Sequence, residues 1–315
     1  MVKVAVVQAE PVWSDVAASV EKTNSLIREA ASNGASLIAF PEVFIPGYPL
    51  FIWINAAEVS KNIDYVKNSL SLKSSLFESI KSTAKDNNIA VVLGFSELDN
   101  NSTYISQVVI DREGDLVLKR RKFKPTHVER VMYGDGTKTN FHNVVELNLG
   151  EENYNVGCLN CWEHAQPLIT AYGAHHNEQL HVGGWPPLAE KAKATGETLE
   201  SLCKDGVNAL ARAYAIQNGC YYLMFNAVIS QKAIDAYGPI PNIFCVGGGC
   251  AAIFGPDGSL ISETLDEFEE GIIYADISKD FIGICKHFLD PIGHYSRPDM
   301  FSLSKSAETF QAFSL

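Results

Sequence analysis

The sequence predicts a layered α/β protein. Short runs of β-branched and apolar residues, each long enough for one strand, alternate with longer stretches whose apolar residues recur at helical spacing. The run Val2–Gln8 predicts a first strand, and Val16–Ser32 predicts a helix that ends at Asn33-Gly34, because glycine favours a helix C-terminus. Hairpins interrupt the alternation later in the chain, so we expect mixed rather than wholly parallel sheets.

The other elements follow from the same patterns. The loop Pro41–Pro49 cannot be helix interior because it holds three prolines in nine residues. Arg112-Glu113-Gly114 and Pro256-Asp257-Gly258 are typical of turns. We expect strands at Ser36–Phe40, Ile89–Phe95, Thr103–Asp111, Asp115–Lys119, Val144–Leu149, Tyr154–Leu159, Gln179–Val182, Tyr221–Asn226, Cys250–Phe254, Leu260–Glu263 and Ile272–Asp276. We expect helices at Ser74–Asn87, Pro167–His176 and Leu199–Asn218.

Length and composition limit the possible classes of protein. The chain has 315 residues, of which 46% are hydrophobic and 20% charged, and no repeat or Gly/Pro/Ser-rich linker divides it. We therefore expect a single domain over residues 1–301, followed by a polar tail at 302–315. A net charge of −12 argues against a nucleic-acid partner. No apolar run approaches the roughly 20 residues that span a bilayer, so we expect no membrane segment.

The cysteines favour a reducing compartment. They number seven, which is odd, and the N-terminus turns polar too early for a secretory signal. We therefore expect a cytoplasmic protein rather than a disulfide framework.

The first segment of chemical interest is Phe40-Pro41-Glu42, where a carboxylate directly follows a predicted buried strand. Loops at the carboxyl ends of strands are where α/β proteins place reacting groups. A solvated loop glutamate would look the same in the sequence, so Glu42 alone decides nothing.

The second segment is the basic run Arg120-Arg121-Lys122-Phe123-Lys124. A lysine held near a reacting carbon could stabilise developing negative charge, which would give Lys122 a role. The run also fits a charged edge that prevents sheet-to-sheet pairing, or a nuclear-localisation or nucleic-acid patch. On this segment alone, the charged edge is the favoured interpretation.

The third segment is Val156–His164, in which Cys161 follows an apolar strand and precedes a predicted helix near Pro167. A thiol there could act as a nucleophile if a positive neighbour lowers its pKa, although a small buried hydrophobe is the commoner state of a cysteine. Cys158 and Cys161 also have the C-x-x-C spacing of a redox or zinc site. The other possible zinc ligands, which are Cys245, Cys250, His175, His176 and His181, show no convincing spacing. Gly247-Gly248-Gly249 lacks a phosphate-loop pattern and indicates a close backbone approach instead.

Together these segments resemble the signature blocks of the nitrilase branch of the carbon–nitrogen hydrolase superfamily. The matching blocks are Phe40-Pro41-Glu42 with Pro46-Gly47-Tyr48-Pro49, Arg121-Lys122 with Pro125-Thr126-His127-Val128-Glu129-Arg130, Asn160-Cys161-Trp162-Glu163-His164, and Gly293-His294-Tyr295-Ser296-Arg297-Pro298-Asp299. They occur in the family's order. An insertion, Glu151-Glu152-Asn153, is expected at a hairpin tip.

The resemblance implies a four-layer α-β-β-α sandwich and a cysteine hydrolase without metal or organic cofactor. Glu42 would be the general base, Lys122 the cation, Cys161 the nucleophile and Glu129 a supporting carboxylate. The implied reaction is hydrolysis of a small-molecule nitrile to the carboxylic acid and ammonia, with some amide, because Trp162 is typical of the nitrile-cleaving branch. The assembly would be a homodimer or a larger spiral homo-oligomer.

Alternatives stay open. The same Glu-Lys-Cys set would serve a cyanide hydratase or dihydratase, or an aliphatic amidase, and a pseudoenzyme or structural assembly protein is the non-enzyme alternative. Substrate contacts are expected from Tyr48, Trp162, His164 and Trp185, although each aromatic could equally be core packing. In the family, a histidine at the position of His164 tends to accompany acid producers, while some cyanide-hydrating relatives carry asparagine there.

Overall fold

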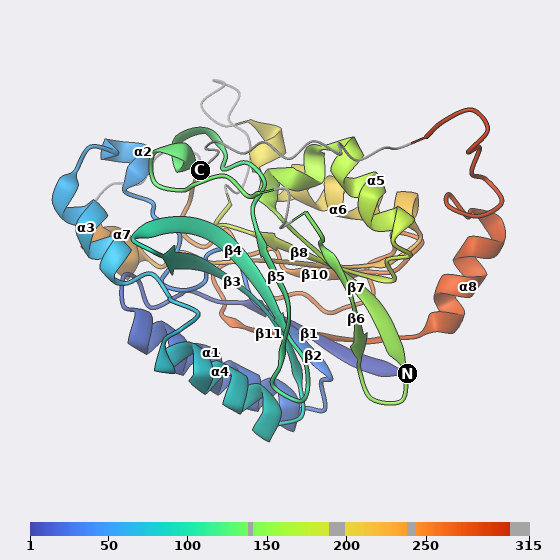
Figure 1. Ribbon diagram of the computed structural model, residues 1–315, viewed down its shortest axis with the longest axis horizontal. Coiled ribbons are helices and arrows are strands. Elements are labelled where there is room, and N and C mark those ends of the chain that lie inside the picture. The colour runs from blue at the N-terminus through green and yellow to red at the C-terminus, as the bar shows by residue number, and fades with distance from the viewer. Residues whose placement is uncertain (138–140, 189–198, 238–243, 303–315) are drawn as a thin grey trace, which may run out of the picture.

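The computed structural model describes residues 1–137, 141–188, 199–237 and 244–302. Its described residues form two β-sheets packed face to face between layers of helices (Figure 1). The strands are β1 (Val2–Gln8), β2 (Leu37–Ala39), β3 (Ala90–Asp99), β4 (Ser102–Ile110), β5 (Leu116–Arg121), β6 (Val144–Asn148), β7 (Asn153–Asn160), β8 (Leu180–Trp185), β9 (Tyr221–Asn226), β10 (Ala252–Phe254) and β11 (Gly271–Ile277). The α-helices are α1 (Val16–Ser32), α2 (Ile52–Asn55), α3 (Val59–Lys67), α4 (Ser75–Asp86), α5 (Pro167–His175), α6 (Lys204–Asn218), α7 (Gln231–Tyr237) and α8 (Lys279–Phe288), and short 3₁₀ helices are η1 (His127–Val131), η3 (Cys161–Ala165) and η4 (Glu200–Leu202).

The two sheets share one design, with parallel strands at the centre and antiparallel strands at the sides. The first sheet has the order β11-β1-β2-β3-β4-β5, with β1, β2 and β3 parallel. The second has the order β10-β9-β8-β7-β6, with β7, β8 and β9 parallel. Because β4 runs against both β3 and β5, strand β5 ends at the same edge of the first sheet as β2 and β3.

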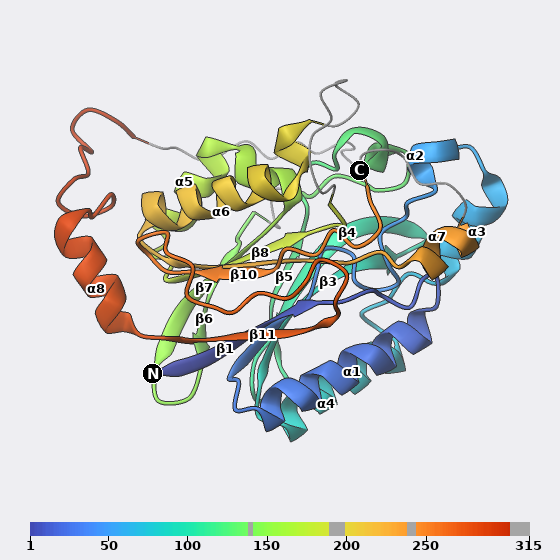
Figure 2. The same ribbon diagram turned by 180° about the vertical axis from the view of Figure 1, so that it is seen from behind.

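Alternation along the strands builds the layers. Val4 and Val6 of β1 face the core between the sheets, while Ala5 and Val7 face the core that α1 and α4 cover. The view from behind shows α1 and α4 on the outer side of the first sheet and α5 and α6 on the outer side of the second (Figure 2). The predicted four-layer α-β-β-α sandwich is confirmed.

Local sequence signals set the helix ends. Asp15 caps α1 by accepting from the main-chain N–H of Ala18 at 2.9 Å, and Ser74 caps α4 by accepting from Phe77 at 3.2 Å. Gly219 ends α6 with a φ of 61°, which glycine adopts without cost. The backbone at Gly249 lies close to the side chain of Gln8 at the end of β1. A Cβ on Gly249 would lie 2.4 Å from that side chain.

Some sequence-based expectations differ from the structure. The strand predicted at Leu260–Glu263 is wrong: it is reduced to one bridge between Leu260 and Phe254, because Ser262 Oγ instead of a main-chain carbonyl accepts from the N–H of Ile253. The helix predicted from Leu199 begins only at Lys204, after η4.

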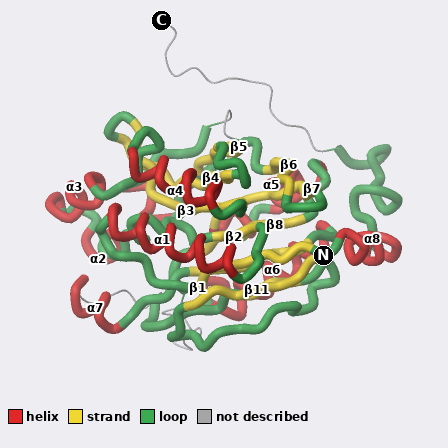
Figure 3. Tube along the Cα trace, turned by 90° about the horizontal axis from the view of Figure 1, so that it is seen from below, coloured by secondary structure: helices red, strands yellow, loops and turns green. Residues whose placement is uncertain are grey.

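Four helices of the structure, α2, α3, α7 and α8, were not expected from the sequence. Helix α8 lies at one end of the sandwich (Figures 1 and 3), and its one buried residue is Ile282. Residues 303–315 of the predicted tail lie outside the described residues. None of the helices in the described ranges has the length and apolar character needed to cross a bilayer.

Candidate active site

The predicted catalytic residues come from segments that follow three strands. Glu42 lies three residues after β2, Lys122 directly follows β5, and Cys161 directly follows β7. The strands β2 and β5 belong to the first sheet and β7 to the second, so residues from both halves of the sandwich meet at one end of it. This is the edge at which α/β proteins place reacting groups.

The ammonium group of Lys122 lies between two carboxylates. Its Nζ donates to Oε1 of Glu42 and to Oε2 of Glu129, each at 2.9 Å, and all three side chains are at most 2% exposed. Glu129 also accepts from the hydroxyl of Tyr48 at 2.8 Å and from the main-chain N–H of Thr126 at 2.6 Å. In the described part of the chain, Oε2 of Glu42 has no hydrogen-bond partner. Glu42 therefore keeps one oxygen available to accept a proton.

Burial and neighbouring charge set the protonation behaviour of this group. Burial raises the pKa of Glu42 to about 8, opposed by Lys122 and reinforced by Glu129. Burial would lower the pKa of Lys122, but the carboxylates of Glu129 and Glu42 raise it well above its ordinary value. Lys122 is therefore a cation at neutral pH, and Glu42 is a much stronger base than an exposed carboxylate.

Cys161 stands at the turn from β7 into η3 and is 5% exposed. Burial raises the pKa of its thiol well above the ordinary value, while Lys122 lowers it. Its φ of 50° lies in the left-handed region that non-glycine residues rarely adopt. Val43 beside Glu42 and His127 near Glu129 share this conformation, with φ of 52° and 48°. Such backbone strain concentrates at functional sites, where the surroundings impose it.

Glu163 fixes the turn that carries Cys161. Its Oε2 accepts from the main-chain N–H of Asn160 at 2.8 Å, and its Oε1 accepts from the guanidinium of Arg120 at 2.6 Å and from the N–H of Phe123 at 2.8 Å. Arg120 also donates to the side chain of Gln107 at 2.7 Å. The carboxylate of Glu163 thus joins the turn after β7 to Arg120 and Phe123, which precede and follow Lys122 in the sequence.

The favoured single-segment interpretation of the basic run, a charged guard on a sheet edge, needs correction. Strand β5 is an edge strand, but Arg120 and Lys122 are buried and their charges are satisfied inside the protein. Arg121 on the opposite face donates to both oxygens of Glu97 at 2.9 Å. Buried cations require such partners, and each of the three has an acidic one.

A cavity of about 50 Å³ opens beside Cys161 and Glu129. Of the predicted substrate contacts, Tyr48, Trp162 and Trp185 line it. His164 is not among the lining residues: it lies behind Cys161, with its ring stacked on Trp185 at a centroid distance of 5.2 Å. The rest of the lining, which the sequence analysis did not foresee, is Trp53, Thr126, Pro186, Pro187, Leu188, Leu202 and Phe244.

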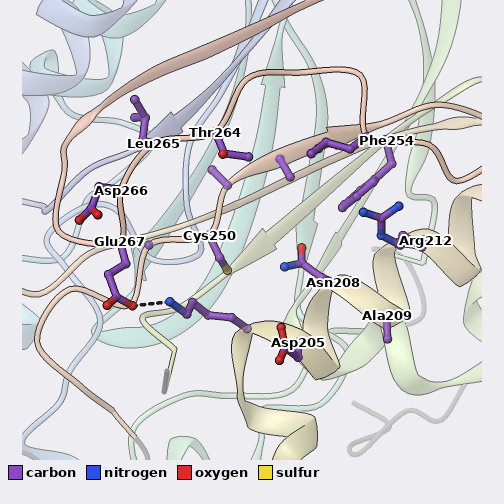
Figure 4. A pocket seen from close by; sticks show the side chains of 15 residues that line it. Asp205, Asn208, Ala209, Arg212, Cys250, Phe254, Thr264, Leu265, Asp266 and Glu267 are labelled. Carbon is purple, nitrogen blue, oxygen red and sulfur yellow. Dashed lines mark hydrogen bonds and ion pairs between the residues drawn. The ribbon is translucent and has the colours of Figure 1, made fainter. Parts of the chain in front are cut away.

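A wider hollow of about 670 Å³ lies elsewhere, between α6 and the segment after β10 (Figure 4). Arg212 of this hollow is held by the ring of Phe254 and the carbonyl of Gly258, and Lys204 pairs with Glu267. Burial raises the pKa of the Cys250 thiol there, but the Lys204–Glu267 ion pair is 20% and 22% exposed, unlike the buried group around Lys122. Its size therefore does not make it the better candidate for chemistry.

The C-x-x-C spacing does not bring its two thiols to one face. Cys158 belongs to the core between the sheets, whereas Cys161 belongs to the core between the second sheet and its helices. In the described ranges no group of three or more His, Cys, Asp or Glu side chains could hold a metal ion.

Two residues that support the site escaped the sequence analysis. Arg120 stands in the basic run for which the sequence alone favours a charged edge, and its partner Glu163 lies 43 residues away in η3, which follows strand β7 of the other sheet. The spacing Asn160 to Glu163 matches a capping box and was the one available signal. Trp53 and Phe244 stand in segments without any recognisable motif.

Comparison with known proteins agrees with this geometry. Residues 3–286 match the carbon–nitrogen hydrolase family. A nitrilase of Meyerozyma guilliermondii is 48% identical over 309 residues, covering 96% of this chain and 95% of that protein. An arylacetonitrilase of Aspergillus oryzae is 48% identical over 303 residues, covering 95% and 89%. Among solved structures, a carbon–nitrogen hydrolase of Helicobacter pylori superposes with a TM-score of 0.74 at 16% identity over 95% of this chain and 96% of that one.

Proposed function

We infer that this chain, which belongs to the carbon–nitrogen hydrolase family, hydrolyses organic nitriles to the carboxylic acid and ammonia. The observation that carries this inference is 48% identity to a nitrilase along nearly the whole of both chains. The arrangement of Lys122 between two buried carboxylates, next to the cavity that exposes Cys161, supports it chemically.

The first step forms a bond between the sulfur of Cys161 and the nitrile carbon. Glu42 accepts the thiol proton through its open oxygen, and a base whose pKa is raised to about 8 suits a thiol better than an ordinary carboxylate would. Glu42 then passes this proton to the nitrile nitrogen as the covalent thioimidate forms, which leaves Glu42 ionised again. Lys122 stabilises the negative charge that develops on that nitrogen.

Water completes the reaction in two additions. Glu42 removes a proton from the first water as it adds to the thioimidate, and the tetrahedral intermediate expels ammonia to leave a thioester. A second water releases the carboxylic acid and restores the thiol. Glu129 holds Lys122 in place through its own hydrogen bonds to Tyr48 and Thr126. General acid–base help of this kind contributes roughly 10²–10⁴-fold.

Two observations bear on the substrate class. The cavity is walled by aromatic side chains, which suits an arylacetonitrile such as the named relative from Aspergillus oryzae acts on. Its volume of about 50 Å³ is smaller than the roughly 150 Å³ cavity that holds benzene in a protein core, which favours a small aliphatic nitrile or cyanide unless the walls separate. Arylacetonitriles remain our first choice, and the cyanide hydratase alternative rests on the volume.

An ammonia-release panel tests the function. Purified protein is given phenylacetonitrile, benzonitrile, propionitrile, cyanide and the matching amides, and the products are identified by chromatography. We expect acid and ammonia from at least one nitrile and slower turnover of the amides. Turnover of amides alone would make the protein an amidase.

We also propose a domain organisation, a cellular compartment and an assembly state. Residues 1–301 form one domain, a proposal supported by the single core that both sheets share. The protein works in the cytoplasm, which its buried thiols Cys158, Cys203 and Cys220 favour. It forms a homodimer or a larger spiral, because Ile284 and Phe288 of α8 are 58% and 74% exposed.

A further inference from the structure

A continuous chain of hydrogen bonds runs from the main chain of Cys161 into the protein core. Nδ1 of His164 lies 2.7 Å from the carbonyl oxygen of Cys161, and Nε2 of His164 lies 2.9 Å from Nε2 of His181. Nδ1 of His181 lies 2.6 Å from Oε1 of Glu178, and Oε2 of Glu178 accepts from the hydroxyl of Tyr214 at 2.6 Å. The members come from η3, β8, the loop before β8 and α6.

The protein backbone is shaped around the carboxylate of this chain. Glu178 and His181 are fully buried, and His164 is 6% exposed. A Cβ on Gly157 would lie 1.7 Å from Oε1 of Glu178, and a Cβ on Gly173 would lie 2.5 Å from Oε2. Both positions therefore have to be glycine for Glu178 to occupy its place. A carboxylate is costly to bury, so its placement needs a reason beyond filling space.

The geometry fixes how many protons the chain holds. A carbonyl oxygen only accepts, so Nδ1 of His164 carries a proton toward Cys161. The contact between the two Nε2 atoms needs a second proton, and the contact between His181 and Glu178 needs a third. Two neutral imidazoles and an ionised carboxylate hold only two such protons and carry a net charge of −1. With three protons the chain has no net charge, which is what its burial demands.

The position of the third proton follows from the surroundings of His164. Burial and the neighbouring His181 lower the pKa of His164 well below its ordinary value, against the opposing effect of the hydrogen bond to the Cys161 carbonyl. His164 is therefore the neutral member that accepts at Nε2. The third proton therefore lies in the 2.6 Å contact between Nδ1 of His181 and Oε1 of Glu178.

We propose that His164, His181 and Glu178 form an uncharged three-proton chain that positions Cys161 for attack. Only the role of Cys161 in this statement rests on the proposed function. The strained φ of 50° at Cys161 has to be imposed from outside, and the bond from His164 acts directly on the carbonyl of the strained residue. His181 and Glu178 are positioning residues, because they fix which nitrogen of His164 carries the proton.

Two tyrosines provide a matched test. Tyr214 and Tyr222 both pack on the ring of His181, at centroid distances of 3.9 and 4.8 Å, and both are buried. Only Tyr214 donates to Glu178. We expect Tyr214→Phe to lower kcat and the rate of Cys161 alkylation by iodoacetamide about tenfold with KM unchanged, the scale of one hydrogen bond to a charged group. Tyr222→Phe should leave kcat and the alkylation rate unchanged.

A second pair of variants tests the proton count. In Glu178→Gln the amide can donate to Nδ1 of His181 and accept from Tyr214, so every contact survives and kcat should stay within about tenfold of wild type. Glu178→Leu removes the partner and should lower kcat about 100-fold, as small misplacements of reacting groups do. Proton NMR of histidine-labelled protein should show one proton on the pair of Nε2 atoms, which His181→Asn removes.

The outcomes separate the two proposals. A wild-type protein that turns over no nitrile would contradict the proposed function. The rate of Cys161 alkylation, with the modified site located by mass spectrometry, would still test the three-proton chain. Equal effects of Tyr214→Phe and Tyr222→Phe would contradict the proposed three-proton chain. A spectrum in which neither histidine carries a proton on Nε2 would contradict it as well. If Glu178→Leu does not fold, the tyrosine pair and the spectrum still decide.

Discussion

Lys122 and Glu42, 80 residues apart in the sequence, are joined by a hydrogen bond of 2.9 Å inside the protein. The bond brings together the ends of β2 and β5, two strands of one sheet that are not neighbours. Together with Glu129 on the other side of the ammonium group, Glu42 keeps Lys122 charged, while burial raises the pKa of Glu42 against the opposing effect of Lys122. The proposed chemistry needs both the charged ammonium group of Lys122 and the raised pKa of Glu42.

Replacing the proposed nucleophile should abolish turnover without unfolding the chain. Cys161→Ala removes the sulfur but keeps a small side chain in the same buried place. We expect no ammonia release from nitriles and an unchanged far-UV circular dichroism spectrum. Cys158→Ala is the matched control, because Cys158 is equally buried but faces the core between the sheets, and it should retain activity. Residual turnover by Cys161→Ala near the wild-type rate would remove Cys161 from the mechanism.

Removing the shared cation should cost both activity and stability. In Lys122→Ala two buried carboxylates lose their common partner, and we expect a fall of about 3–5 kcal/mol in the free energy of unfolding measured with urea. Nitrile turnover should disappear while the elution volume in size-exclusion chromatography stays that of the wild-type protein. Lys124→Ala, at a side chain 57% exposed, should change neither quantity. Near-normal rates in Lys122→Ala would contradict a catalytic role and favour the basic run as a charged edge that prevents sheet-to-sheet pairing.

The pH dependence should report the raised pKa of Glu42. The carboxyl must be ionised to accept the thiol proton, so kcat/KM should rise as pH increases through about 8. The sign for stability is the opposite. A folded-state pKa above the ordinary 4.5 stabilises the fold fully below that value, and this contribution is lost as pH rises through about 8. In Glu42→Gln, the free energy of unfolding measured with urea should not show this loss of stability. A rise of kcat/KM centred near the ordinary pKa of 4.5 would contradict the assignment of Glu42 as the base.

Arg120 and Glu163 should behave as one unit. Breaking the pair by Arg120→Met or by Glu163→Gln leaves a buried charge without its partner, and each change should cost about 3–5 kcal/mol of stability and most of the activity. The double variant should be less destabilised than the sum of the two. Additive losses in a double-mutant cycle would show that the two groups do not depend on each other.

The assembly proposal predicts an effect of charge on α8. Phe288→Lys should shift the protein to a smaller species in size-exclusion chromatography with light scattering, because it places a charge on an exposed apolar face. Asp280→Lys on an exposed position of the same helix is the control and should leave the assembly unchanged. A wild-type protein that runs as a monomer would end the proposal.

Much of the fold could be predicted because local patterns were strong. The helix Val16–Ser32 and the strands Val2–Gln8 and Tyr221–Asn226 were predicted with their observed bounds. Glu42 and Cys161 could be singled out because each follows a predicted strand, whereas the basic run around Lys122 alone favoured a charged edge and only the family resemblance joined it to the other two. What could not be predicted depends on contacts between distant segments. Nothing in the basic run shows that Arg120 turns inward to Glu163, and nothing near His164 shows that its ring lies behind Cys161.

The inward turn of β5 makes the site sensitive to strand register. Arg120 and Lys122 stand two residues apart, so they point to the same side, about 7 Å from each other along the strand, and Arg121 points to the opposite side. A one-residue deletion within β5 would exchange these orientations and carry both inward cations to the wrong face. The tip of the β6–β7 hairpin, where Glu151 is exposed, has no such constraint. Natural variation in length should therefore accumulate at that tip and be absent from β5.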